Sequence, residues 1–293
     1  MKVAIYGRKF NDTAISYVQQ LIDCLEENQV ELIIYSAFHA YLVPRIKLPS
    51  NVEVFTRHDE LQLQEIKCMI SVGGDGTMLD TLTLVRDSGI PIIGINMGRL
   101  GFLASIAKQE IKTAVDSLMK GYFTIEKRSL IRLESDKELF GGVNYGLNEV
   151  TIHKKDTSSM IIIHAYLNGE FLNSYWADGL ILATPTGSTG YSLSCGGPII
   201  FPNSENFVIT PISPHNLNVR PIILSDNQVI TFEVEGRSAH YLATLDSRTE
   251  TLDTHTQSAV RKESFQLNLI RLSTENYLGT LRNKLMWGLD TRN

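Results

Sequence analysis

The 293-residue chain has no excess of positive charge, because 27 lysine and arginine residues face 32 aspartate and glutamate residues. A net charge of −5 excludes a global basic field that would recruit nucleic acid or an anionic membrane surface. No apolar run approaches the ~18 residues of a membrane span, and the N-terminus MKVAIYGRKF is too short and too polar for a signal peptide. If the substrate is a polyanion, local donors or a metal must therefore hold it.

Cysteine is scarce, and Cys24, Cys68 and Cys195 form no CxxC pair. This excludes a disulfide framework and fits a reducing, cytoplasmic location. Cys195 has no spaced histidine partner, so we expect a packing thiol rather than a nucleophile. The 7 histidines show no HxH, HxxxH or HExxH spacing, and the sequence therefore predicts no metal site built from protein ligands.

Two familiar nucleotide-binding fingerprints are also missing. No GxxxxGK[ST] is present, which excludes a P-loop protein. Gly74-x-Gly76 lacks the third glycine of GxGxxG, because Leu79 holds that place. Any nucleotide site must therefore be built differently.

The chain does contain 43% hydrophobic residues, which is enough for a large core, and its length suggests two domains. Short apolar runs alternate with helical periodicity in the first part. The expected strands are Lys2–Gly7, Val30–Tyr35, Val52–Thr56, Lys67–Val72 and Ile90–Ile95. The expected helices run from Asp12 or Thr13 to Asn28, from Thr77 to Ser88, and from Ile111 to Gly121. This alternation predicts an α/β domain with a parallel sheet and a functional crevice beyond the carboxyl ends of its strands.

The stretch Val72–Asp80, VGGDGTMLD, lies at such a strand end. Its glycines permit close backbone approach and positive φ, and the free N–H groups that open the next helix suit phosphate. Asp75 is then a carboxylate beside a phosphate site, able to take a proton from a hydroxyl nucleophile or to help hold magnesium. The alternative is a tight turn with a solvated aspartate. Thr77 and Asp80 are expected to form a capping box, and Gly89 to cap the helix C-terminus.

After about residue 125 the segments become strand-like. Met160–Leu167, the turn Asn168-Gly169 and a strand through Trp176 predict a type I′ hairpin. Further expected strands are Gly179–Ala183, Phe207–Ile212, Pro221–Leu224, Val229–Glu235, Tyr241–Leu245 and Phe265–Leu272. We therefore expect a β-sandwich-like second domain over 126–272, and a closing helix Asn276–Trp287 that joins 273–293 to the α/β domain 1–125.

Two polar stretches interrupt these strands. In GLNEV, Asn148 and Glu149 enter a strand Val150–His153, and this amide and carboxylate can grip a sugar diol or a base edge. The alternative is a plain turn before an edge strand. TPTGSTGYSLSCGGP, at 184–198, is dense in hydroxyls between the apolar strands GLILA and PIIF. We expect it to line a cleft and cradle a dinucleotide rather than form a merely polar surface loop.

Together these stretches resemble the NAD kinase family over nearly the whole chain. The matching segments, in order, are GGDGT at 73–77, NMGRLGFL at 96–103, NE at 148–149, DGLILATPTGSTGYSLSCGGP at 178–198 and PHNLNVRP at 214–221. GGDGT alone is shared with diacylglycerol and sphingosine kinases, and in looser form with phosphofructokinase. The segment at 184–198 resembles NAD kinases specifically.

The resemblance implies transfer of the γ-phosphate of ATP to the 2′-hydroxyl of the adenosine ribose of NAD. It implies ATP and NAD as substrates, a divalent ion such as Mg²⁺ held mainly through ATP phosphates, and a homodimer or homotetramer that binds neither nucleic acid nor membrane. Asp75 is the implied general base. The implied NAD contacts are Asp75, Gly76, Phe102, Asn148, Glu149, Asp178, Thr186, Thr189, Gly190, Tyr191, Ser192, Leu193 and Ser194. Trp176, His215 and Arg248 are further candidates.

Three positions depart from the family pattern. Gly190 stands where alanine is usual, Trp176 where many bacterial members have a basic residue, and Arg248 where glutamine is more usual. Arg248 would favour recognition of the product phosphate. Two rival hypotheses are a lipid kinase of the diacylglycerol kinase type, which would need a membrane-facing surface, and a non-catalytic NAD-sensing module, which would have no need of Asp75.

Overall fold

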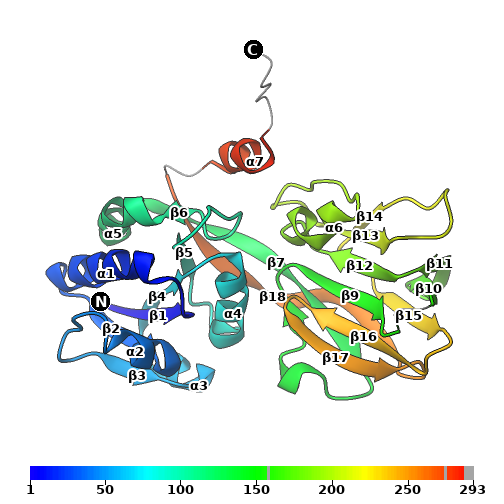
Figure 1. Ribbon diagram of the computed structural model, residues 1–293, viewed down its shortest axis with the longest axis horizontal. Helices are drawn as coiled ribbons and strands as arrows, with labels where there is room; N and C mark the ends of the chain where they lie inside the picture. Colours follow the sequence, from blue (N-terminus) through cyan, green and yellow to red (C-terminus); the bar gives the residue numbers. More distant parts are fainter. Residues whose placement is uncertain (157–158, 274–275, 287–293) are drawn as a thin grey trace, which may run out of the picture. The chain divides into compact units, whose positions relative to one another are not determined.

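The structure, a computed structural model, describes residues 1–156, 159–273 and 276–286. The chain divides into two compact units, one of residues 1–126 with 267–293 and the other of Lys127–Gln266 (Figure 1). Two long strands, β7 (Phe123–Ser135) and β18 (Ser258–Leu272), carry the chain from the first unit into the second and back. Residue Trp287, at the expected end of the closing helix, lies outside the described residues.

The first unit contains a parallel sheet, as expected from the alternating pattern. Its strands, in the order β5-β4-β1-β2-β3, are Ile92–Asn96, Ile66–Val72, Lys2–Gly7, Glu31–Tyr35 and Glu53–Phe55. The short strand β6 (Ile106–Ala107) and the end of β18 both pair with β5 in parallel. The carboxyl ends of β4, β5 and β18 therefore lie at one edge of the sheet.

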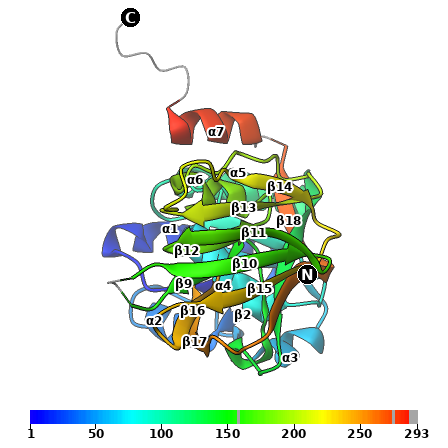
Figure 2. The same ribbon diagram turned by 90° about the vertical axis from the view of Figure 1, so that its right-hand side faces the viewer.

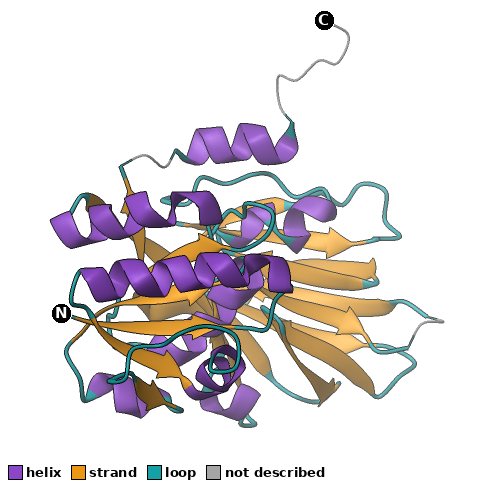
Figure 3. Ribbon diagram, turned by 60° about the vertical axis from the view of Figure 1, so that its left-hand side comes forward, coloured by secondary structure: helices purple, strands orange, loops and turns teal. Residues whose placement is uncertain are grey.

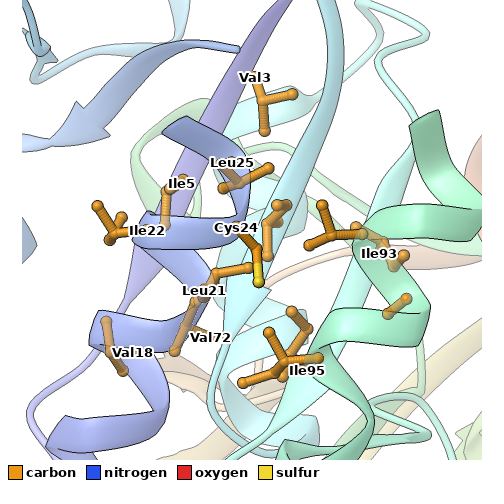
Figure 4. Packing of buried hydrophobic residues seen from close by; sticks show 14 of the residues in the cluster. Val3, Ile5, Val18, Leu21, Ile22, Cys24, Leu25, Val72, Ile93 and Ile95 are labelled. Atoms are coloured by element: carbon orange, nitrogen blue, oxygen red, sulfur yellow. The ribbon is translucent and has the colours of Figure 1, made fainter. Parts of the chain in front are cut away.

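The helices of this unit are α1 (Ile15–Glu27), α2 (Ser36–Leu42), α3 (His58–Gln62), α4 (Asp75–Val85), α5 (Ile111–Lys120) and α7 (Tyr277–Leu285), with single turns η1 (Asp12–Ala14) and η2 (Lys108–Glu110). The apolar stripe of α1, including Val18, Leu21 and Leu25, packs on Val3 and Ile5 of β1 (Figure 4). Each such side chain, fully buried, contributes about 1.5–3 kcal/mol. Gly121 ends α5 in the left-handed conformation, as predicted.

Several local expectations about this unit were wrong. Helix α4 begins at Asp75, and its N-cap Gly74 has no side chain to cap with, so Thr77 and Asp80 form no capping box. Asp80 instead accepts hydrogen bonds from Tyr6 and Arg8. The helix C-cap is Arg86 rather than Gly89. Asn11, not Asp12 or Thr13, caps the first helical turn. Helices α2 and α3 were not predicted, because each is too short to show a clear 3.6-residue period.

The second unit is almost entirely β-structure (Figures 2 and 3). One antiparallel sheet has the order β14-β13-β12-β9-β16-β17, with strands Ile222–Ser225, Asn206–Ile212, Gly179–Ala183, Glu149–Lys154, His240–Leu245 and Arg248–Asp253. The other contains β11 (Glu170–Ala177), β10 (Ile161–Leu167), β15 (Ile230–Glu235) and β18, and β7 pairs with β18 and with β8 (Tyr145–Gly146). One apolar core takes side chains from both sheets, so the predicted sandwich is confirmed.

The hairpin β10–β11 turns at Asn168 and Gly169, and both residues have positive φ, as a type I′ turn requires. Strands β7 and β17 were not predicted, because charged residues interrupt their alternation. Strand β12 is buried on both faces. Leu180 and Leu182 enter the sandwich core, whereas Ile181 and Ala183 pack with Ile200 and Cys195 of the segment that follows. That segment contains the short helices η4 (Gly187–Thr189) and α6 (Tyr191–Ser194). A further single turn, η3 (Phe140–Gly142), lies before β8.

Candidate functional site

Asp75 occupies the first turn of α4, directly beyond the carboxyl end of β4. Its carboxylate accepts three backbone hydrogen bonds from the loop after β5. The N–H of Phe102 donates to Oδ2 at 2.8 Å, and those of Leu103 and Ala104 donate to Oδ1 at 3.1 Å and 2.9 Å. Asp75 is therefore a fixed carboxylate rather than a solvated turn residue, and the NMGRLGFL stretch lies directly against GGDGT.

Gly101 explains the close approach of this loop. A Cβ atom at Gly101 would lie 1.8 Å from Oδ1 and 2.5 Å from Cγ of Asp75. Only a residue without a side chain leaves room for the carboxylate in this position. Neighbouring Gly76 is exposed on α4, and a Cβ there would meet nothing within 4 Å.

Asn148 and Glu149 lie at the start of β9, where the side chain of a residue distant in sequence binds the backbone N–H groups. Asp246 is partly buried, and its carboxylate accepts from the N–H groups of Leu147 and Asn148 at 2.8 Å and of Glu149 at 3.2 Å. No sequence motif marks Asp246 as part of the site. Its signal is weak, because an aspartate with positive φ between two strands is a common turn residue.

The side chains of Asn148 and Glu149 each present a buried oxygen, Oδ1 and Oε2, that has no hydrogen-bond partner among the described residues. Burial and, to a smaller extent, the nearby Asp246 carboxylate together raise the pKa of Glu149 to about 8. Burial also raises the pKa of Asp246, against the three N–H donors that lower it. Near neutral pH Glu149 is thus largely protonated, and its carboxyl group can donate as well as accept.

This shift predicts how stability depends on pH. The folded pKa of Glu149 exceeds the usual 4.5, so the folded chain holds a proton that the unfolded chain has released. Stability should therefore fall as pH rises from about 5 to 8, by at most about 1.4 kcal/mol per pH unit from this group. We expect Glu149→Gln to flatten that slope and to be more stable than the parent at pH 9.

Urea unfolding of both proteins at several pH values checks this prediction. Glu205→Gln, at an exposed glutamate of the same unit, is the matched control and should keep the parent slope. Parallel stability curves for the parent and Glu149→Gln would contradict a raised pKa at Glu149.

The segment after β12 packs against this start of β9. The N–H of Thr184 donates to the carbonyl of Asn148 at 2.8 Å, and its hydroxyl donates to the carbonyl of Leu147 at 2.6 Å. A Cβ at Gly187 would lie 2.1 Å from the carbonyl oxygen of Asn148, so glycine is required for the approach. The structure thus brings together GLNEV and TPTGSTG, which are separated in sequence by the 33 residues 151–183.

Most hydroxyls of this segment bond within the protein. Ser188 donates to the carbonyl of Pro185, Ser192 pairs with Thr210 at 2.8 Å, and Thr189 donates to the carbonyl of Thr186. The hydroxyl of Thr186 accepts from the buried Arg128 at 3.2 Å. These hydroxyls shape the segment. Its exposed residues are Tyr191, Ser194 and Gly196, and its partly exposed residues are Thr189, Gly190, Leu193, Cys195 and Pro198.

Gly190 lies beside Glu149. A Cβ there would sit 3.2 Å from the carbonyl oxygen of Gly187 and 3.3 Å from Oε2 of Glu149. Both distances are shorter than an ordinary van der Waals contact. The family pattern suggests that alanine would be tolerated here or slightly stabilising, but its methyl group would require the neighbouring groups to move.

Three further candidates gather near the far end of β12. Asp178 forms an ion pair with Lys154, Nζ to Oδ1 2.6 Å. The rings of Trp176 and His215 lie 4.5 Å apart, and the N–H of His215 donates to the carbonyl of Trp176 at 2.8 Å. Burial raises the pKa of Tyr191, and the nearby Cys195 and Asp178 raise it in the same direction.

Arg248 and Phe102 complete the predicted set. The guanidinium of Arg248 donates to the backbone carbonyls of Val143 and Tyr145 and lies over the ring of Phe140. In the first unit, Phe102 packs against Tyr277 of α7, with ring centroids 6.5 Å apart. No described helix is long and apolar enough to cross a membrane. Among described residues, no three His, Cys, Asp or Glu side chains cluster as metal ligands.

Comparison with known proteins matches both units. The family model described as ATP-NAD kinase N-terminal domain matches residues 3–123, and the one described as ATP-NAD kinase C-terminal domain matches residues 147–272. The chain is 50% identical to the NAD kinase of Cytophaga hutchinsonii and 46% identical to that of Flavobacterium psychrophilum, in each case over 100% of both chains.

Solved structures agree on the fold. The crystal structure of yeast NADH kinase complexed with NADH superposes with a TM-score of 0.87 at 24% identity, covering 99% of this chain and 89% of that one. An NAD kinase from Archaeoglobus fulgidus in complex with ATP gives a TM-score of 0.76 at 22% identity, covering 98% and 99%. From the two family matches and the full-length relatives, we conclude that the chain belongs to the NAD kinase family.

Proposed function

We propose that this protein transfers the γ-phosphate of ATP to the 2′-hydroxyl of the adenosine ribose of NAD, giving NADP. The observation that carries the proposal is the pair of buried oxygens on Asn148 and Glu149 that have no hydrogen-bond partner in the part of the chain that the structure describes. Buried polar atoms in proteins are normally satisfied, so two such atoms beside an exposed polar segment favour a ligand with several hydroxyl and amide groups. NAD has both.

In the first unit, Asp75 is the proposed general base. A carboxylate offers about four lone-pair sites, and three are taken by the N–H groups of Phe102, Leu103 and Ala104. Oδ1 accepts two of these bonds and Oδ2 only one, so Oδ2 is the atom with a site left for the hydroxyl proton. Gly76 and Phe102 lie beside this carboxylate and are proposed to border the substrate.

In the second unit, Asn148 and Glu149 are proposed to contact NAD directly. The other proposed site residues are Asp178, Thr186, Thr189, Gly190, Tyr191, Ser192, Leu193 and Ser194, with Trp176, His215 and Arg248 as weaker candidates. Of these, Thr186 and Ser192 are buried with internally bonded hydroxyls, so they act by shaping the segment. The adjacent, tilted rings of Trp176 and His215 offer an aromatic surface for a base.

A divalent ion fits this chain as part of the donor substrate. Mg²⁺ prefers substrate phosphates and water with one or two carboxylates, and Asp75 has too few lone pairs left to serve as both base and metal ligand. We therefore propose that the ATP phosphates hold the ion, which neutralises phosphate charge when bound. Phosphoryl transfer then requires the chain mainly to position the reacting groups, and Asp75 and its loop supply that positioning.

We propose a homodimer or homotetramer located in the cytoplasm. The second unit exposes Phe171 and Trp176 on β11, which ends the order of its sheet among the described strands, and Ile223 on β14, which ends the other. Large apolar side chains on sheet edges favour association with another copy. Sedimentation velocity of the purified chain tests this, and a monomer at micromolar concentration would contradict it.

A coupled assay tests the proposed reaction. The purified chain should form NADP from NAD and ATP–Mg²⁺, as detected by an NADP-specific dehydrogenase. Phosphorylation of diacylglycerol instead would support the lipid kinase hypothesis. NAD binding by calorimetry without any turnover, across ATP, other nucleotide triphosphates and polyphosphate as donors, would support the NAD-sensing module.

A separate experiment tests the proposed contact between Asn148 and NAD. Asn148→Ala removes a buried partner for a polar group of the ligand, which typically costs about 1–3 kcal/mol. We expect NAD to bind this variant about 5- to 150-fold more weakly by isothermal titration, with little change in unfolding temperature. Wild-type affinity would return GLNEV to the interpretation of a plain turn.

A further inference from the structure

Arg271 is a partly buried arginine near the carboxyl end of β18, and neither the resemblance nor the proposed function assigns it a role. Its side chain is 15% exposed. Nε donates to Oε2 of Glu126 at 3.0 Å, Nη1 donates to the hydroxyl of Ser105, and Nη2 donates to the carbonyl of Phe102 at 3.2 Å. Two of these partners belong to the loop that holds Asp75.

The contact with Phe102 reaches Asp75 through one peptide group. The carbonyl of Phe102 and the N–H of Leu103 belong to the same planar, trans peptide, so they point in opposite directions. Arg271 bonds the carbonyl side, and Asp75 Oδ1 accepts from the N–H side at 3.1 Å. Fixing the carbonyl therefore aims the N–H at the carboxylate.

Glu126 of β7 binds the Nε edge of the Arg271 guanidinium. Its carboxylate receives Nε of Arg271 and is itself only 22% exposed. A guanidinium is a rigid planar fork, so binding one edge to Glu126 determines where the other edge points. Lysine would keep the positive charge but could not reproduce three donors in this plane.

We propose that Arg271 is a positioning residue for phosphoryl transfer: it orients the Phe102–Leu103 peptide and thereby holds Asp75 where its Oδ2 can take the proton of the acceptor hydroxyl. This rests on the proposed role of Asp75. The competing interpretation is an ion pair that merely ties β18 to β7. The two differ in kinetics, because a positioning residue affects the chemical step through Asp75, whereas a structural tie affects stability alone.

The test compares kcat and KM of the parent, Arg271→Met and Arg271→Lys in the coupled assay. We expect kcat to fall about tenfold or more in both variants, since small misplacements of reacting groups have such effects, while KM for NAD and for ATP changes less than about threefold. Arg261→Met is the matched control. Arg261 lies on the same strand and forms an ion pair with Glu134, and among the described residues it bonds none of the loop 97–105, so Arg261→Met should keep the parent kcat.

The decisive measurement is a double-mutant cycle. In an Asp75→Asn background, Arg271→Lys should cause no further loss of kcat, because it acts through the carboxylate that is already gone. An equal loss in both backgrounds, or a parent-like kcat in the single variants, would overturn the positioning role. A parent chain that forms no NADP would instead overturn the proposed function itself. If Arg271→Met does not fold, Arg271→Lys carries both comparisons.

Discussion

Replacing Asp75 by asparagine is expected to lower kcat for NAD phosphorylation by about 10²–10⁴-fold, the usual effect of losing a general base. The structure adds a second consequence. An amide has one acceptor oxygen, so its NH₂ group must face one of the N–H donors that Asp75 now accepts. The unsatisfied donor should destabilise the loop by about 1–3 kcal/mol.

Steady-state kinetics and thermal unfolding of the Asp75→Asn variant separate the two effects. Assays well below the unfolding temperature should still show the full loss of kcat, with NAD affinity changed much less. Asp87→Asn, at an exposed carboxylate just beyond the end of the same helix, should behave like the parent. A kcat near the parent value for Asp75→Asn would remove Asp75 from the role of base.

The second large effect is expected at Gly101. A methyl group there would lie 1.8 Å from Oδ1 of Asp75, so Gly101→Ala must displace either the loop or the carboxylate. The carboxylate can rotate away only by giving up three hydrogen bonds, and it then no longer sits where the hydroxyl is deprotonated. We expect kcat to fall by about 100-fold or more, although Asp75 itself is intact.

Gly98→Ala provides a matched control in the same loop. A Cβ at Gly98 would meet only Oδ1 of Asn96, at an ordinary 3.7 Å. This variant should therefore keep turnover close to the parent, and circular dichroism should show both variants folded. Parent-like kcat in Gly101→Ala would mean that the working enzyme does not hold Asp75 against this loop.

Much of the fold could be predicted from the sequence because it rests on local periodicity. Apolar residues at 3.6-residue spacing identified α1 and α5, and short β-rich runs identified β1, β4 and β12. Asn168-Gly169 predicted the hairpin because few other residue pairs accept positive φ at both positions. Helices α2 and α3 and strands β7 and β17 were not predicted, because short or charged segments show too few periods of the apolar pattern to be distinguished from loops.

The candidate site shows the same division. The sequence alone determined where the polar motifs stand: Asp75 after β4, Asn148 and Glu149 before β9, and the hydroxyl-rich segment after β12. Only the tertiary structure decided what those residues contact. The N–H donors of Asp75 come from residues 27 to 29 positions away. Asp246 accepts from the N–H of Glu149, which is 97 positions away. Arg271 donates to the carbonyl of Phe102, which is 169 positions away. Periodicity reports on neighbours along one element, whereas these hydrogen bonds depend on how separate strands are ordered in a sheet, which no local pattern encodes.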